Sequence, residues 1–196
     1  MIEKLSQKTA IIISKSPNAL YDIDVYKYAF FIIYSTILFS IISLLIGLIV
    51  GNVVQSLLFF CSFYTLRIFA GGYHCSKESY CEIITTILLL FSIVLIRITE
   101  QHNKYIIVLI TTIIGALIIL ATAPIDCIEK HITEKEKTTY KAVTIIVITI
   151  ISCVIILSLL LKKLNISTPL SFSIIVESIL LIFGRIQQMH HTKYAK

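Results

Sequence analysis

Long apolar runs separated by short polar connections divide the chain. Residues 28–66 contain no Asp, Glu, Lys or Arg, and a membrane span needs about 20 consecutive apolar residues. This stretch therefore predicts two spans, separated by a tight turn at Gly51 and Asn52. Pro124 cannot continue a helix and ends the fourth span. The six predicted helices cover residues 28–50, 53–69, 80–98, 105–123, 142–161 and 166–183.

Composition supports a membrane protein. Hydrophobic residues make up 57% of the 196 residues and charged residues only 14%, whereas soluble domains carry about 25% charged residues. Backbone groups in lipid must be satisfied internally, and these runs are too long and uniform for barrel strands. We expect one all-α polytopic domain over residues 1–196. A disordered chain, a secreted disulfide scaffold and a free cytosolic enzyme are excluded.

Lys and Arg are unevenly distributed between the two sets of connections. Thirteen lie in the N-terminal segment, the connections after the second and fourth helices, and the C-terminal segment, and four lie on the other side. The positive-inside rule predicts cytoplasmic termini and cytoplasmic loops over 67–81 and 124–141. Topology explains the net charge of +6, and no nucleic-acid signal is evident. Residues 1–27 show no cleavable signal peptide and form either an interfacial segment or a loose tail.

The connection over residues 67–81 combines residues suited to catalysis. It contains Arg67, two adjacent glycines, His74, Cys75 and Cys81. A thiol becomes a strong nucleophile once a base removes its proton, so His and Cys together indicate nucleophilic catalysis. The side chains of adjacent residues diverge, which disfavours Cys75 as the partner of His74. Cys81 is too far along one unbroken helix, so the pairing requires a break in the chain.

A capping box predicts that break. Ser79-x-x-Glu82 precedes an apolar run, so we expect Ser79 to cap the third helix and Cys81 to occupy its second position. The helix macrodipole favours a thiolate there, and the free N–H groups of the first turn suit an oxyanion. Gly71 and Gly72 give the backbone the freedom to fold His74 back toward Cys81.

Other interpretations of these residues stay open at this point. The connection is equally compatible with a structural loop. A metal site formed by His74, Cys75 and Cys81 lacks an evident fourth ligand, and we expect neither metal nor cofactor. Cys61 and Cys153 are interpreted as small packing residues within spans. An odd total of five Cys and a reducing compartment argue against disulfides.

The stretch Arg67-x-x-Ala-Gly-Gly-x-His74, with Cys81 seven residues later, resembles the accessory gene regulator protein B (AgrB) family of Gram-positive bacteria. The likeness extends to chain length, the six-span plan, the cytoplasmic motif loop and the sequence Ala-Pro-Ile-Asp at residues 123–126. It implies a bacterial cell-membrane cysteine endopeptidase that processes an autoinducing-peptide precursor in quorum sensing. It also implies that His74 and Cys81 are catalytic. Arg67 and Gly72 match motif positions of less clear role.

The implied mechanism begins with attack of the Cys81 thiolate on a peptide bond of an AgrD-like precursor, with His74 as general base. The C-terminal tail leaves, and the rest of the peptide stays on Cys81 as a thioester. A side-chain thiol or hydroxyl of the peptide then closes a thiolactone or lactone ring. The loop over 125–141 mixes four Lys with three Glu, so simple basicity does not mark it as substrate-binding.

A third catalytic group is left open by the sequence. An intramembrane carboxylate is a functional candidate by default, which singles out Glu177. Protonated and hydrogen-bonded to nearby serines, it would be structural instead. Glu82 is more simply a cap residue. The candidates to orient His74 are Glu78, Glu82, Asp126 and Glu177, and the serines are Ser171, Ser173 and Ser178.

The alternative function is a small permease or a peptide-binding scaffold without peptidase activity. Transporters often contain paired halves with interrupted helices, and the chain shows no convincing internal repeat. Small residues allow close helix contacts, either inside the protein or in a homodimer. These small residues are Ser43 and Gly47 on the first helix and Thr111, Gly115 and Ala116 on the fourth.

Overall fold

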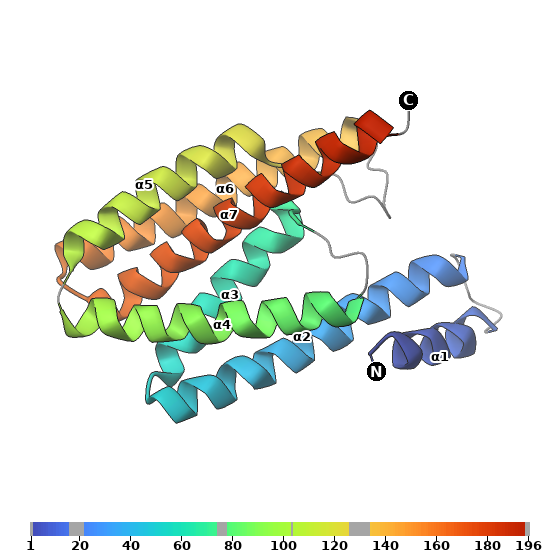
Figure 1. Cartoon of the computed structure of the whole chain (residues 1–196), viewed down its shortest axis with the longest axis horizontal. Coiled ribbons are helices and arrows are strands. Elements are labelled where there is room, and N and C mark those ends of the chain that lie inside the picture. The colour runs from blue at the N-terminus through green and yellow to red at the C-terminus, as the bar shows by residue number, and fades with distance from the viewer. Residues whose placement is uncertain (1, 16–21, 74–77, 103, 126–133, 195–196) are drawn as a thin grey trace.

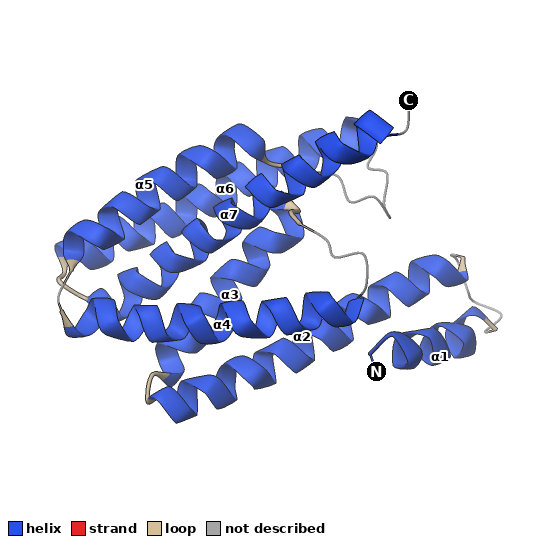
Figure 2. Ribbon diagram, viewed as in Figure 1, coloured by secondary structure: helices blue, strands red, loops and turns tan. Residues whose placement is uncertain are grey.

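The protein is all-helical in a computed structural model that describes residues 2–15, 22–73, 78–102, 104–125 and 134–194. Figure 2 shows only helices and loops in these ranges. The helices are α1 (Ile2–Ser14), α2 (Ile23–Val50), α3 (Val53–Ala70), α4 (Glu78–Gln101), α5 (Tyr105–Thr122), α6 (Glu134–Leu160) and α7 (Leu164–Tyr194).

Six of these helices, α2 to α7, are long and apolar enough to cross a membrane. The prediction of a multi-pass α-helical membrane protein is therefore confirmed. Many large apolar side chains point outward, as expected for a surface that faces lipid rather than water. The end of α3, the start of α4, the end of α5 and the start of α6 lie at the same end of the bundle as the C-terminus. α2 meets α3, α4 meets α5 and α6 meets α7 at the opposite end (Figure 1).

Several helix boundaries differ from the predicted ones. The helix of the fifth span, α6, begins at Glu134 instead of Ala142, and the helix of the sixth, α7, continues to Tyr194 instead of ending at Phe183. Apolar runs mark only the part of a helix inside lipid. The flanking Glu, Lys, Gln and Arg residues are good helix formers, so the helices continue into water. The connections over 67–81 and 124–141 are correspondingly shorter.

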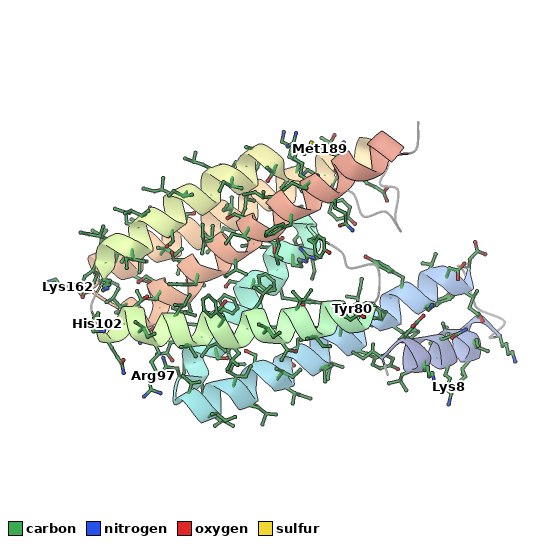
Figure 3. All side chains as sticks on the ribbon, in the orientation of Figure 1. Lys8, Tyr80, Arg97, His102, Lys162 and Met189 are labelled. Atoms are coloured by element: carbon green, nitrogen blue, oxygen red, sulfur yellow. The ribbon has the colours of Figure 1, made fainter. Side chains whose placement is uncertain are left out.

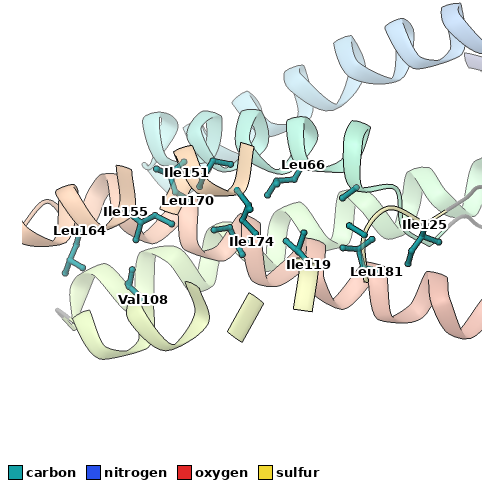
Figure 4. Close-up of a cluster of buried hydrophobic side chains, with 13 residues drawn as sticks. Leu66, Val108, Ile119, Ile125, Ile151, Ile155, Leu164, Leu170, Ile174 and Leu181 are labelled. Carbon is teal, nitrogen blue, oxygen red and sulfur yellow. The ribbon is translucent and has the colours of Figure 1, made fainter. Parts of the chain in front are cut away.

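α7 is the central helix of the bundle. About 61% of its most apolar window is buried, against 22–39% for the other five spans. One apolar cluster joins it to α3, α5 and α6 through residues such as Leu66, Ile119, Ile174 and Leu181 (Figure 4). A second cluster, which includes Phe59 and Ile93, joins it to α2, α3 and α4. Groups carried by α7 are therefore fixed relative to every neighbouring span.

Small residues bring helices together inside the protein. A Cβ added to Gly115 would lie 2.8 Å from Ile174 Cγ2, and one added to Gly47 would lie 2.9 Å from Ser56 Cβ. The Ser43 and Ser56 hydroxyls bond to each other at 2.8 Å. Gly51 ends α2 at φ 78° in the predicted tight turn. These contacts confirm internal packing of the predicted small residues and leave a homodimer untested.

The predictions for Cys61 and Cys153 as packing residues are wrong. Both are free thiols with exposed side chains on the outer surface of the bundle.

The N-terminal segment forms the amphipathic helix α1, which packs on α2 through a Lys27–Glu3 ion pair of 3.2 Å and a Thr9–Tyr34 hydroxyl bond of 2.9 Å. A loose tail is thereby excluded for Ile2–Ser14.

Candidate functional site

Two glycines turn the chain sharply after α3. Gly71 has φ 79° and Gly72 has φ 132°, conformations that other residues adopt only with strain. The Gly71 N–H donates to the Arg67 carbonyl at 3.2 Å and completes the last turn of the helix. The predicted backbone freedom is therefore used at both positions.

Arg67 holds the chain that follows this turn. It lies in the last turn of α3, where its Nη1 donates to the Gly71 carbonyl at 3.1 Å and its Nη2 donates to the Tyr73 carbonyl. The same Nη1 lies 3.8 Å from Glu177 Oε1 on α7. One planar guanidinium thus joins three groups, a geometry for which Arg is better suited than Lys. The backbone is fixed up to the residue before His74.

Glu177 is completely buried, and Arg67 is its ion-pair partner. Within the described residues neither carboxylate oxygen has a hydrogen-bond donor. The serines expected to donate to it bond to backbone carbonyls instead, Ser173 to Leu170 and Ser178 to Ile175, each at 2.7 Å. Ser171 likewise donates to the Val108 carbonyl at 2.9 Å. The interpretation of Glu177 as a serine-bound structural acid is therefore wrong.

Gly72 fits a space with no room for a side chain. A Cβ there would lie 1.9 Å from Arg67 Nη1 and 3.5 Å from Glu177 Oε1. On α7, a Cβ added to Gly184 would lie 2.7 Å from the Gly72 carbonyl carbon. The Tyr73 N–H donates to the Leu180 carbonyl at 3.1 Å. The connection therefore lies directly against α7, with a glycine on each side of the contact.

The segment after α5 supports the same connection from another side. The Ile125 N–H donates to the Ala70 carbonyl at 3.0 Å. A Cβ added to Gly71 would lie 2.3 Å from the Ile125 carbonyl oxygen. The Ala-Pro-Ile sequence at 123–125 thus packs on the glycine turn, which gives this stretch a structural link to the Arg67–Cys81 motif.

The predicted catalytic pair is only partly described. His74 and Cys75 lie outside the described residues, and so does Asp126. Cys81 belongs to α4, but its side chain and that of Ser79 are also outside the described part. Because α4 begins at Glu78, Ser79 is its second residue and not the expected N-cap, and Cys81 is the fourth residue. An acidic residue is itself favourable in a first turn, which accounts for the earlier start. Cys81 remains in the first turn, and its pairing with His74 stays a prediction.

Sequence reasoning missed three contributors to this arrangement. Gly184 lies inside an otherwise regular helix, and Leu180 and Ile125 act through their backbone groups. A glycine within a helix is costly relative to Ala, which is the one signal that pointed to Gly184.

Among the described residues no group of three His, Cys, Asp or Glu side chains is placed to hold a metal ion. The metal set of His74, Cys75 and Cys81 falls outside those residues.

The chain was compared with known protein families, curated proteins and solved structures. A family model described as accessory gene regulator B matches residues 2–181, which include the motif connection and all six spans except the end of α7. No curated protein and no solved structure matches the chain.

Proposed function

The chain belongs to the accessory gene regulator B family, which acts in agr quorum-sensing peptide processing, and from this we propose that it is a membrane-embedded cysteine endopeptidase. Its substrate would be the precursor of an autoinducing peptide, and its place the cell membrane with the motif connection facing the cytoplasm. The observation that carries the proposal is the family match over residues 2–181, because the matched region includes the motif from Arg67 to Cys81.

Cys81 is the nucleophile of this proposal and His74 its base. His74 takes the thiol proton as Sγ attacks the carbonyl carbon of the scissile bond, and it returns that proton to the leaving amine. The C-terminal tail departs and leaves a thioester on Cys81. A thiol or hydroxyl of the bound peptide attacks the thioester, closes the ring and restores the Cys81 thiol.

The backbone of α4 supports this role for Cys81. The first N–H groups of a helix have no carbonyl partner within it, and the macrodipole places partial positive charge there. Both favour a thiolate and an oxyanion next to the fourth residue of α4.

In the same proposal Arg67 and Glu177 are positioning residues. Arg67 bonds the carbonyls of Gly71 and Tyr73, and Glu177 supplies the buried counter-charge that keeps the guanidinium in place. Gly72 leaves the space that the guanidinium occupies. Together they set the direction in which the chain enters His74.

The test is cleavage of a candidate precursor by the purified protein in liposomes. Cys81→Ala and His74→Ala are expected to abolish processing, whereas Cys75→Ala retains it. Cys61→Ala and Cys153→Ala are the matched controls, because these thiols are exposed on the outer surface of the bundle.

Two results contradict the proposal. If Cys75→Ala lost processing while Cys81→Ala retained it, the nucleophile would be Cys75 and not Cys81. Full processing by both variants would remove the peptidase assignment and favour a permease or scaffold, which would bind the precursor without cleaving it.

A further inference from the structure

A hollow of about 410 Å³ lies where α5 ends, between the beginning of α6 and the last part of α7. Residues 122–125 form one wall, α6 contributes Lys137, Thr138 and Lys141, and α7 contributes Arg185 and Gln188. Among its described lining residues, none belongs to the motif connection. The hollow lies at the same end of the bundle as Gly71 and Gly72.

The lining of the hollow is strongly basic. Among the described residues that line it, three are Lys or Arg and none is Asp or Glu. Lys137 and Lys141 are four residues apart on α6, and Arg185 joins them in the lining from α7. The fork of the Arg185 guanidinium is suited to the oxygens of a phosphate group.

The hollow lies at the level where the candidate span of α5 ends. It begins at Thr122, the last residue of the α5 span, and the α7 span continues past Arg185 to Met189. Exposed apolar side chains occupy the neighbouring turns on the lipid side of the boundary, including Leu120, Ile182 and Phe183. Phosphates of lipid headgroups lie at this depth, with acyl chains alongside such residues.

We propose that this hollow is a binding site for the phosphate of an anionic phospholipid. The distribution of Lys and Arg predicts that this end of the bundle faces the cytoplasm, where anionic lipids give the membrane a negative surface potential that attracts basic residues. Basic pockets between spans on that side are suited to such headgroups.

The wall of the hollow is in direct contact with the motif connection. Residues 123–125 form its wall, and the Ile125 backbone bonds to Ala70 and packs on Gly71. A bound phosphate that orders this wall also orders the glycine turn. Anionic lipid is therefore expected to stabilise the end of the protein that carries the motif.

Native mass spectrometry of the purified protein, titrated with phosphatidylglycerol and with phosphatidylcholine, tests the site without reference to catalysis. Phosphatidylglycerol is expected to bind the wild type more tightly. Lys141→Gln and Arg185→Gln should each weaken that binding roughly fivefold. The charge-preserving Lys141→Arg should bind as the wild type does. The Lys162→Gln/Lys163→Gln double variant is the control, because both lysines lie in the α6–α7 turn at the opposite end of the bundle (Figure 3).

Four results overturn the proposal. The two lipids bind equally, or the control double variant weakens phosphatidylglycerol as much as Lys141→Gln and Arg185→Gln do. Inorganic phosphate alone displaces phosphatidylglycerol at equal concentration, which would mean a site for a free anion. Lys141→Gln and Arg185→Gln keep lipid affinity but lose affinity for the precursor, which would assign the hollow to the peptide.

Discussion

At the scale of single residues, the Arg67–Glu177 pair organises the site. Glu177 has no exposed surface, and no described group donates a hydrogen bond to its carboxylate. Its compensation is the positive charge of Arg67, 3.8 Å away. A buried carboxylate without such compensation is expensive in a membrane protein. We explain the presence of Glu177 by its partner, because Arg67 donates hydrogen bonds to two carbonyls of the motif connection.

Loss of the Glu177 charge should therefore destabilise the protein and slow processing. Glu177→Gln leaves a largely buried cation unpaired, a change that costs about 3–5 kcal/mol in buried pairs. The matched control is Lys27→Gln, which breaks the exposed pair with Glu3 and should cost less than about 1 kcal/mol. Thermal unfolding in detergent measures both. Equal effects of the two variants would contradict the role given to Glu177.

Gly72→Ala should abolish processing through the position of Arg67. The added Cβ would lie 1.9 Å from Arg67 Nη1, so the guanidinium must move away from the Gly71 and Tyr73 carbonyls. Gly51→Ala is the control, because Gly51 also has positive φ but its nearest atom would be 3.8 Å away. That variant should lose about 1 kcal/mol of stability and keep its activity. A Gly72→Ala protein that cleaves at the wild-type rate would contradict this explanation.

Part of the site was predictable from the sequence. The sequence singled out Arg67 and both glycines, which the structure brings into one network, because they lie on one short stretch. His74 and Cys81 stay predictions. The pairing of Arg67 with Glu177 was not predictable, because it joins two helices far apart along the chain. Gly184 was missed for the same reason, because a side chain there is excluded only by the closeness of Gly72, which lies far away along the chain.

At the scale of elements, α7 determines how the spans pack. Gly115 on α5 lies against Ile174, and Ser171 on α7 bonds to Thr112 at 3.0 Å and to the Val108 carbonyl at 2.9 Å. Apolar attraction alone does not distinguish a helix from lipid, so close packing and interhelical hydrogen bonds join the spans. The apolar runs predicted these helices well, but they contained no information on where each helix ends in water.

Gly115→Ala should separate α5 from α7. The added methyl carbon would lie 2.8 Å from Ile174 Cγ2 and 3.1 Å from the Ile175 nitrogen, and overpacking of this kind costs about 1–3 kcal/mol. Ile113→Ala on the exposed face of α5 is the control, with an expected change below about 1 kcal/mol. Thermal unfolding in one detergent compares them. A larger loss in Ile113→Ala would contradict the packing described for α5.

At the scale of the whole molecule, both proposed functional features lie at one end of the bundle. The Arg67 network and the basic hollow share the segment 123–125 between them. The positive-inside rule predicts that this end faces the cytoplasm. The precursor would then be cleaved on the side where it is synthesised.

Topology can be measured with single cysteines introduced into a cysteine-free chain. Lys163→Cys, in the α6–α7 turn, should react with a membrane-impermeant maleimide in intact cells. Lys141→Cys, near the start of α6, should react only after the membrane is permeabilised. The reverse pattern would place the motif connection outside the cell and contradict the predicted orientation.

The central claim is that Cys81 becomes acylated by the precursor, and rapid acid quench followed by peptide mass spectrometry tests it most directly. The account predicts that the peptide containing Cys81 gains the mass of the N-terminal part of the precursor. Hydroxylamine should remove this mass, as expected for a thioester, and Cys81→Ala should lack it. An adduct on Cys75, or product formed by Cys81→Ala at the wild-type rate, would contradict the claim.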